Sequence, residues 1–238
     1  MAKQTETMQK NTLWCIPCAF FLLACVLNWI GCIQGTDLAD AVKPALLPLL
    51  CATSLAYLLG RDEVDFRAAG LLVAAQLFGC AGDILLMPSS DVLFLIGMTA
   101  FLVGHLFYIR LFGGQSWRGL KPGPWAISIL VMLAVVLGLV KAIGIEGAMF
   151  WPMTVYGCVL MLLIFSALAG VLRMPRDRRA TWWILLAGAL LFTFSDACIA
   201  MGIFGVMTFA LRHFVVMFTY LAAQSLLAVG GVRLILGR

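Results

Sequence analysis

Hydrophobic positions in this chain form long runs, and short links with charged or turn-forming residues separate them. The clearest links are RDEVDFR at 61–67, PSSD at 88–91, GGQSWRGLKPG at 113–123 and RMPRDRR at 173–179. An α-helix that crosses a bilayer needs about 20 mainly apolar residues. The runs meet this length, so we expect spanning helices near 13–33, 43–60, 68–87, 92–112, 124–144, 149–172, 181–203 and 211–235.

Two links, 145–148 and 204–210, contain few polar residues and leave a count of seven spans as the alternative. The basic residues test the count independently. With eight spans, thirteen of the sixteen Lys and Arg residues lie on the side of both termini. The opposite side has Lys43, Lys141 and Arg212. Because Lys and Arg favour the cytoplasmic side of a membrane, this bias supports eight spans and predicts that both termini are cytoplasmic.

The composition supports a membrane protein. Hydrophobic residues make up 63% of the 238 positions and charged residues 11%, whereas a soluble domain has about a quarter charged residues. We therefore expect an all-α membrane protein with one eight-helix domain at 13–235 and short cytoplasmic tails at 1–12 and 236–238. We expect no nucleic-acid partner, and we favour a bacterial inner (plasma) membrane, with the endoplasmic reticulum as the eukaryotic alternative.

The cysteines and histidines do not suggest a metal centre. Most of the eight cysteines lie inside apolar runs, where cysteine behaves as a small apolar residue. Cys15 and Cys18 form a lone CxxC, without the second pair that a zinc site of this type needs. With two histidines in the chain and no matching carboxylate spacing, we predict no metal and no cofactor.

Two acidic residues, Asp83 and Asp196, lie inside predicted spans, whereas the other nine lie in links or near span ends. A carboxylate within the bilayer costs several kcal/mol unless it is paired or faces a wet cavity. Neither aspartate has a basic residue one turn away in its own span, so we expect each to find its partner at the site of the other. From the span ends, their depths differ by roughly 5 Å, which allows them to meet.

Such a carboxylate pair suits proton-transfer chemistry. Two carboxylates in a low-dielectric site cannot both ionise comfortably, so we expect one protonated acid beside one ionised base. Residues three or four positions apart share a helical face, and several polar residues follow this spacing. The candidates for the same cavity are Gln76 on the face of Asp83, His105 with Tyr108, Tyr220 with Gln224, and Lys43 at the outer start of its span. Helix–helix hydrogen bonding, or snorkelling of Lys43, is the structural alternative.

Five segments, in order, carry a resemblance to the YhhN-like lysoplasmalogenases: VKPALLPLL at 42–50, GCAGDILLM at 79–87, FLIGMTAFLVGHLFYI at 94–109, GALLFTFSDACIAM at 188–201 and TYLAAQSLLAVG at 219–230. The resemblance implies a membrane hydrolase that cleaves the vinyl-ether bond of a lysoplasmalogen. Its products would be a fatty aldehyde and a glycerophospho-ethanolamine or glycerophosphocholine. The family's motif positions fall on Lys43, Asp83, His105, Tyr108, Ser195, Asp196, Tyr220 and Gln224.

The resemblance and the chemistry together give each candidate a role. We predict that Asp83 and Asp196 are the catalytic acid and base, and that His105 and Tyr108 orient them or the attacking water. The residues expected to bind the lysophospholipid substrate are Lys43, Gln76, Ser195, Tyr220 and Gln224.

Three other classes of protein were compared with this prediction. A proton-coupled transporter also has carboxylates within the membrane, although the sequence has no evident internal repeat. An intramembrane aspartyl protease would need a GxGD motif, and Cys80 stands where its first glycine would be. A lipid-binding scaffold would explain the spans but not the two buried acids. The transporter is the main alternative.

Overall fold

The all-α prediction is confirmed by a computed structural model that describes residues 12–88, 90–206 and 209–237. Nearly all of the predicted tail at 1–12, and Arg238, lie outside the described residues. The helices are α2 (Cys15–Gln34), α3 (Leu38–Leu59), α4 (Phe66–Leu85), α5 (Asp91–Ser116), α6 (Pro122–Ile143), the short 3-10 helix η1 (Gly147–Met149), α7 (Phe150–Arg173), α8 (Arg179–Ile203) and α9 (Arg212–Ile235). Within the described ranges, eight helices are long and apolar enough to cross a membrane, which confirms the predicted count.

Two helices extend beyond their predicted bounds. Helix α3 begins at Leu38 rather than near residue 43 and continues through Pro44 and Pro48. Proline at 48 cannot donate to the Pro44 carbonyl one turn earlier. The thiol of Cys80 on α4 contacts that carbonyl at 3.8 Å. A spanning helix tolerates proline when a neighbouring helix supplies such a partner, and this contact also fixes the start of α3 against α4.

Helix α5 continues to Ser116 rather than ending near residue 112. The guanidinium group of Arg173 donates to the carbonyls of Ser116, at 2.9 Å, and Arg118, at 2.6 Å. Ser116 is the last residue of α5 and Arg118 lies just beyond it, where backbone carbonyls have no partner within the helix. The longer helix therefore depends on a residue of α7 that the local pattern of apolar residues does not reveal.

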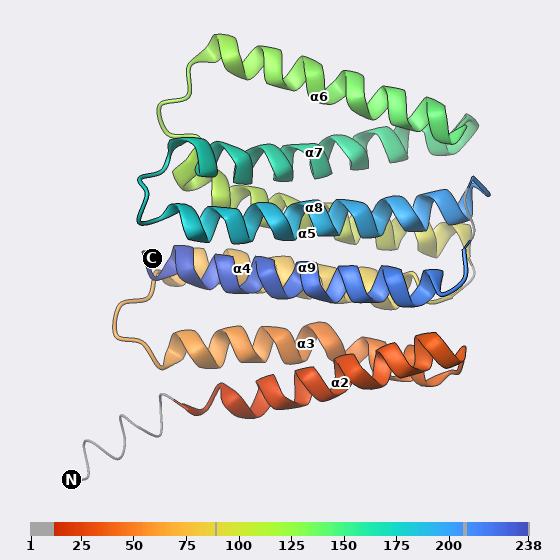
Figure 1. Ribbon diagram of the computed structural model, residues 1–238, viewed down its shortest axis with the longest axis horizontal. Coiled ribbons are helices and arrows are strands. Elements are labelled where there is room, and N and C mark those ends of the chain that lie inside the picture. The colour runs from red at the N-terminus through yellow and green to blue at the C-terminus, as the bar shows by residue number, and fades with distance from the viewer. Residues whose placement is uncertain (1–11, 89, 207–208, 238) are drawn as a thin grey trace.

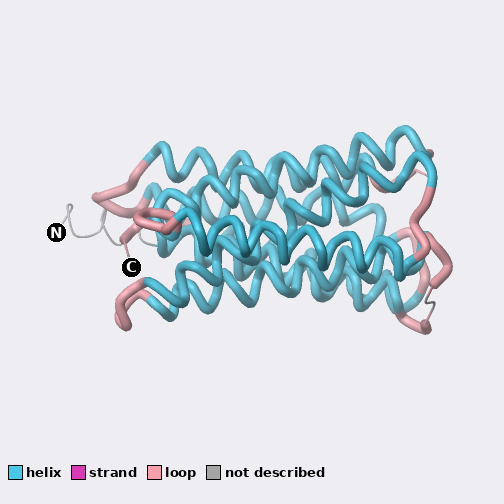
Figure 2. The backbone as a smooth tube through the Cα atoms, turned by 90° about the horizontal axis from the view of Figure 1, so that it is seen from above, coloured by secondary structure: helices cyan, strands magenta, loops and turns pink. Residues whose placement is uncertain are grey.

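The helices form an elongated bundle in which successive helices run in opposite directions (Figure 1). Helix α9 has the largest buried share of the spanning helices described and packs closely on α8. Helix α6 lies at the edge of the bundle and packs on α7 (Figure 1). The start of α2 and the end of α9 lie at the same end of the bundle, as an even number of spans requires (Figure 2). The cytoplasmic location of that end stays a prediction.

Close helix contact at one glycine gives a stability prediction. A Cβ atom on Gly170 of α7 would lie 1.9 Å from the ring of Trp182 on α8, which is fully buried. We expect Gly170→Ala to lower the melting temperature in detergent, because overpacking of a filled core costs about 1–3 kcal/mol. Gly138→Ala on α6 is the matched control, since a Cβ atom there would meet nothing within 4 Å. Equal melting temperatures for the two variants would contradict this reading of the α7–α8 contact.

Candidate active site

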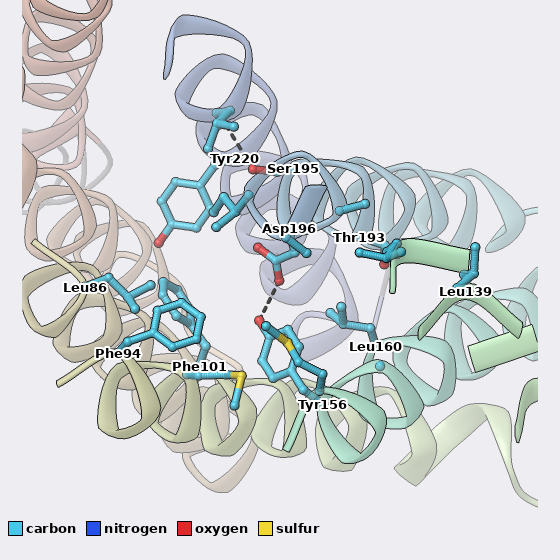
Figure 3. Close-up of a pocket in the computed structure, with 18 of the residues that line it drawn as sticks. Leu86, Phe94, Phe101, Leu139, Tyr156, Leu160, Thr193, Ser195, Asp196 and Tyr220 are labelled. Atoms are coloured by element: carbon cyan, nitrogen blue, oxygen red, sulfur yellow. Dashed lines mark hydrogen bonds between the residues drawn. The ribbon is translucent and has the colours of Figure 1, made fainter. Parts of the chain in front are cut away.

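A cavity of about 180 Å³ lies among the helices in the half of the bundle remote from the chain ends. Its polar residues are Lys43, Asp83, Tyr156, Thr193, Ser195, Asp196 and Tyr220. The rest of the wall is mainly Leu, Val, Ile, Met, Phe and Ala from α5 to α9. Asp196 lies near the centre of the labelled group, between Leu86 and Phe94 on one side and Leu139 on the other (Figure 3). The cavity therefore combines a compact polar centre with apolar surroundings.

Asp83, near the end of α4, has two polar partners in this cavity. The hydroxyl of Tyr220 on α9 donates to Oδ2 of Asp83 at 2.7 Å. The Lys43 ammonium of α3 lies 3.9 Å from Oδ1. The carboxylate is almost fully buried, while the Lys43 side chain is 19% exposed. The ammonium and the hydroxyl both stabilise the negatively charged form of the carboxyl group.

Glycines allow these side chains to approach each other. A Cβ atom on Gly82 would lie 2.5 Å from the ring of Phe101, so α5 can pack this closely beside Asp83 because residue 82 is glycine. One turn earlier, a Cβ atom on Gly79 would lie 3.3 Å from Nε2 of Gln224 on α9. The GCAGD segment thus supplies close helix packing as well as the carboxylate.

A series of hydrogen bonds through residues outside the cavity wall positions the Tyr220 hydroxyl. The Tyr108 hydroxyl donates to Oε1 of Gln224 at 3.0 Å, and Nε2 of Gln224 donates to the Tyr220 hydroxyl at 3.5 Å. Tyr108 and Gln224 are buried and do not belong to the cavity wall. Among the residues described, their hydrogen bonds lead to Asp83 through Tyr220, which suits positioning rather than contact with a substrate.

Asp196, on α8, has a tyrosine partner that the sequence analysis missed. The Tyr156 hydroxyl of α7 donates to Oδ2 of Asp196 at 2.5 Å (Figure 3). The neighbouring Ser195 donates to the Val216 carbonyl at 3.0 Å and so ties α8 to α9. One signal could have revealed Tyr156: its hydroxyl lies within an apolar run, and a buried tyrosine hydroxyl usually needs a partner.

The two aspartates line one cavity, but their hydrogen-bond partners are tyrosines rather than each other. From the sequence, we expect the partner of each aspartate at the site of the other; the structure brings both aspartates to one cavity and gives each a tyrosine as its hydrogen-bond partner. Tyr156 of α7 and Tyr220 of α9 each place a hydroxyl group within hydrogen-bonding distance of one carboxyl group. The cavity thus contains two separately held carboxyl groups, and within the described residues Asp83 has a cationic neighbour while Asp196 has none.

His105 and Gln76 lie outside the cavity wall. The His105 ring is buried and packs edge-on against Phe192, with centroids 4.4 Å apart, and against Tyr156 at 5.9 Å. Neither ring nitrogen makes a hydrogen bond of normal geometry to the residues described. Gln76 donates to the Ser54 hydroxyl at 3.3 Å, which links α4 to α3. In this structure the His105 ring thus contacts Tyr156 from outside the cavity wall, and Gln76 contributes to helix packing.

The donor set offers no obvious place for a metal ion. Within residues 12–88, 90–206 and 209–237, no three His, Cys, Asp or Glu side chains gather closely enough to hold one. The polar groups of the cavity are carboxyl, ammonium and hydroxyl groups, which bind and transfer protons without a metal.

Comparison with known proteins supplies the context for this geometry. The model of the YhhN family matches residues 38–231. The human lysoplasmalogenase TMEM86B is 32% identical over 226 residues, which cover 92% of this chain and 87% of that protein. The human lysoplasmalogenase TMEM86A is 27% identical over 224 residues, covering 90% of this chain and 85% of that protein. No solved structure matches the chain.

Proposed function

This chain belongs to the YhhN family, and on that premise we propose that it is a membrane-embedded lysoplasmalogenase. The reaction adds water across the vinyl ether of a lysoplasmalogen and yields a fatty aldehyde and a glycerophospho-ethanolamine or glycerophosphocholine. One observation carries the mechanism: two carboxyl groups, in different electrostatic surroundings, line a mainly apolar cavity within the spanning helices. A lipid with a single chain and a phosphate head group suits such a cavity.

We assign the role of general acid to Asp196 and that of general base to Asp83. The Lys43 ammonium and the Tyr220 hydroxyl stabilise negative charge on Asp83. Asp196 has one hydroxyl donor and no cation beside it among the described side chains, so it is the carboxyl group that holds the proton. Its Oδ2 accepts from Tyr156, which leaves Oδ1 for the proton that is transferred.

The reaction begins when Asp196 protonates the β-carbon of the vinyl ether and produces an oxocarbenium ion. The Asp83 carboxylate stabilises this cation electrostatically and takes a proton from the water that attacks it. The resulting hemiacetal then collapses: its hydroxyl proton returns to Asp196, and Asp83 gives its proton to the departing glycerol oxygen. Both carboxyl groups return to their starting states, and one water is consumed for each bond broken.

Lys43 has a second role in this proposal. Its side chain is partly exposed, beside the carboxylate and near the outer start of α3. An ammonium group in that position can attract the substrate phosphate while it stabilises Asp83. The phosphate head group of the substrate would then lie beside the Lys43 ammonium group.

Loss of the Tyr156 hydroxyl is expected to slow the reaction with little effect on substrate binding. Tyr156→Phe removes the donor that orients Asp196 but keeps the ring that packs on His105. We expect kcat to fall by about tenfold to a hundredfold and KM to change little, because the contact acts on the proton donor. Tyr57→Phe is the control, since Tyr57 lies outside the cavity. An unchanged kcat for Tyr156→Phe would contradict the role given to this hydroxyl.

The direct test of the function is aldehyde release by the purified protein in detergent from a lysoplasmenyl-ethanolamine. A hydrolase releases aldehyde without a sealed membrane, whereas a transporter needs a vesicle and a gradient. The absence of aldehyde release from well-folded protein would refute the proposed reaction.

The lysoplasmalogenase relatives give the transporter alternative no support. The bacterial inner membrane stays the predicted location.

A further inference from the structure

We propose that the hydrocarbon chain of the substrate occupies an apolar arm of the cavity and enters it sideways from the bilayer, past Leu139 of α6. This inference rests on the proposed function and deepens it, because it assigns a place to the part of the substrate that does not react. We call this region the chain arm and define it by Val136, Leu139, Val140, Met161, Ala197 and Ala200.

The chain arm is formed by α6, α7 and α8. Val136 and Val140 of α6 are buried, which shows that this face of the helix points inward. A Cβ atom on Gly157 of α7 would lie 2.9 Å from Cγ1 of Val136, so the glycine allows α6 to pack closely at this point. The arm is continuous with the polar centre, because Asp196 and Ala197 of α8 line the same cavity.

Leu139 marks the place where the arm opens. It lines the cavity, yet it is 54% exposed on the outside of the bundle. Each of the other residues that line the cavity is buried or only partly exposed. Figure 3 shows Leu139 at the edge of the labelled group, beyond Thr193 and away from Leu86 and Phe94. In a spanning bundle this surface faces lipid, so the opening connects the polar centre with the bilayer interior.

The depth of the opening fits a lipid substrate. Leu139 lies four residues before the end of α6, and Asp196 seven before the end of α8. At 1.5 Å per residue, both lie within about 6–11 Å of the same end of the bundle. A lipid whose head group is at that surface therefore has its upper hydrocarbon chain at the level of the opening.

The distribution of charged and apolar groups in the cavity indicates which kind of molecule binds there. The cavity has a partly exposed ammonium group at Lys43 and an apolar arm that is open to lipid. A single-chain phospholipid has an anionic phosphate for the first and a hydrocarbon chain for the second. Its vinyl-ether carbons lie between these two parts. In the cavity, Asp83 lies beside Lys43, and Asp196 directly precedes Ala197 of the chain arm.

Leu139→Trp tests this assignment, because a larger side chain at the opening narrows the path of a long chain. We expect kcat/KM for a long-chain lysoplasmenyl-ethanolamine to fall by about tenfold or more, the scale of a steric change in an apolar pocket. A short-chain analogue passes the same opening but does not extend through it once bound, so its kcat/KM should change by less than about twofold. Leu130→Trp is the control, since Leu130 is on α6, 66% exposed and outside the cavity.

Equal behaviour of Leu139→Trp and Leu130→Trp would overturn the proposal, and so would an equal loss for short and long chains. A second measurement separates this inference from the reaction itself. A saturated alkyl-ether lysophospholipid has no vinyl group to protonate, so its binding is independent of turnover. Weaker binding of its long-chain form to Leu139→Trp alone would support the chain arm even if no aldehyde were released. Unchanged binding would reject it.

Discussion

Asp196→Asn is expected to release fatty aldehyde at least about a hundredfold more slowly than the wild type, because general acid catalysis contributes roughly 10²–10⁴-fold. The amide oxygen of Asn can still accept the hydrogen bond from Tyr156, so the side chain should keep its place. The amide nitrogen, however, cannot transfer a proton to carbon. The measurement is the rate of aldehyde release at saturating lysoplasmenyl-ethanolamine, with the melting temperature as a check on folding.

Asp83→Asn should cause a loss of similar size for a different reason. The neutral amide neither takes a proton from water nor stabilises the oxocarbenium ion, while the Tyr220 hydroxyl still has an acceptor. Asp91→Asn, at the exposed start of α5 and outside the cavity, is the matched control and should keep wild-type activity. Activity within about tenfold of wild type in either cavity variant, with a normal melting temperature, would show that the carboxyl pair is not the acid and base.

Lys43→Met is the second change with a large expected effect. It removes the ammonium that lies 3.9 Å from Asp83 and leaves a buried carboxylate without its cation. Asp83 would then take up a proton more readily and lose its function as a base. We expect kcat/KM to fall by about a hundredfold, the scale for removal of one charged or donor group from a preorganised site.

Two further variants separate the role of Lys43 from a general effect of charge. Lys43→Arg keeps the cation and should retain more activity than Lys43→Met, although its geometry differs. Lys141→Met removes a basic residue from the last turn of α6, on the same side of the predicted membrane and outside the cavity. It should behave as wild type. An equal loss in Lys43→Met and Lys141→Met would mean that overall surface charge attracts the substrate.

The sequence predicted the helices well, because the bilayer imposes a length and a polarity that can be counted along the chain. Eight spans and the weak links at 145–148 and 204–210 were anticipated from hydrophobic runs and basic residues. The start of α3 and the end of α5 were not predicted, since both depend on partners from other helices. Cys80 contacts the carbonyl freed by Pro48, and Arg173 supports the end of α5.

The sequence predicted site residues only where placing the side chain within the bilayer is energetically unfavourable. Asp83 and Asp196 were found because a carboxylate in the bilayer needs an explanation, and the two line one cavity. Tyr156 was missed, because an aromatic residue in an apolar run is typical of a packed helix, and its hydroxyl group was not considered. The sequence also could not tell that Tyr108 and Gln224 lie behind Tyr220. Which side chain faces the cavity and which supports it depends on helix rotation within the bundle.

The location of the cavity in the half of the bundle remote from the chain ends has a consequence for the fate of the products. If the termini are cytoplasmic, as the basic residues predict, the water-soluble glycerophosphodiester leaves on the opposite side of the membrane. In the proposed reaction, the fatty aldehyde, a reactive electrophile, would pass into the lipid phase through the opening at Leu139. Removal of the aldehyde would then require a reaction that oxidises or reduces aldehydes at the membrane, while the head group would be released into the aqueous compartment on the other side from the termini.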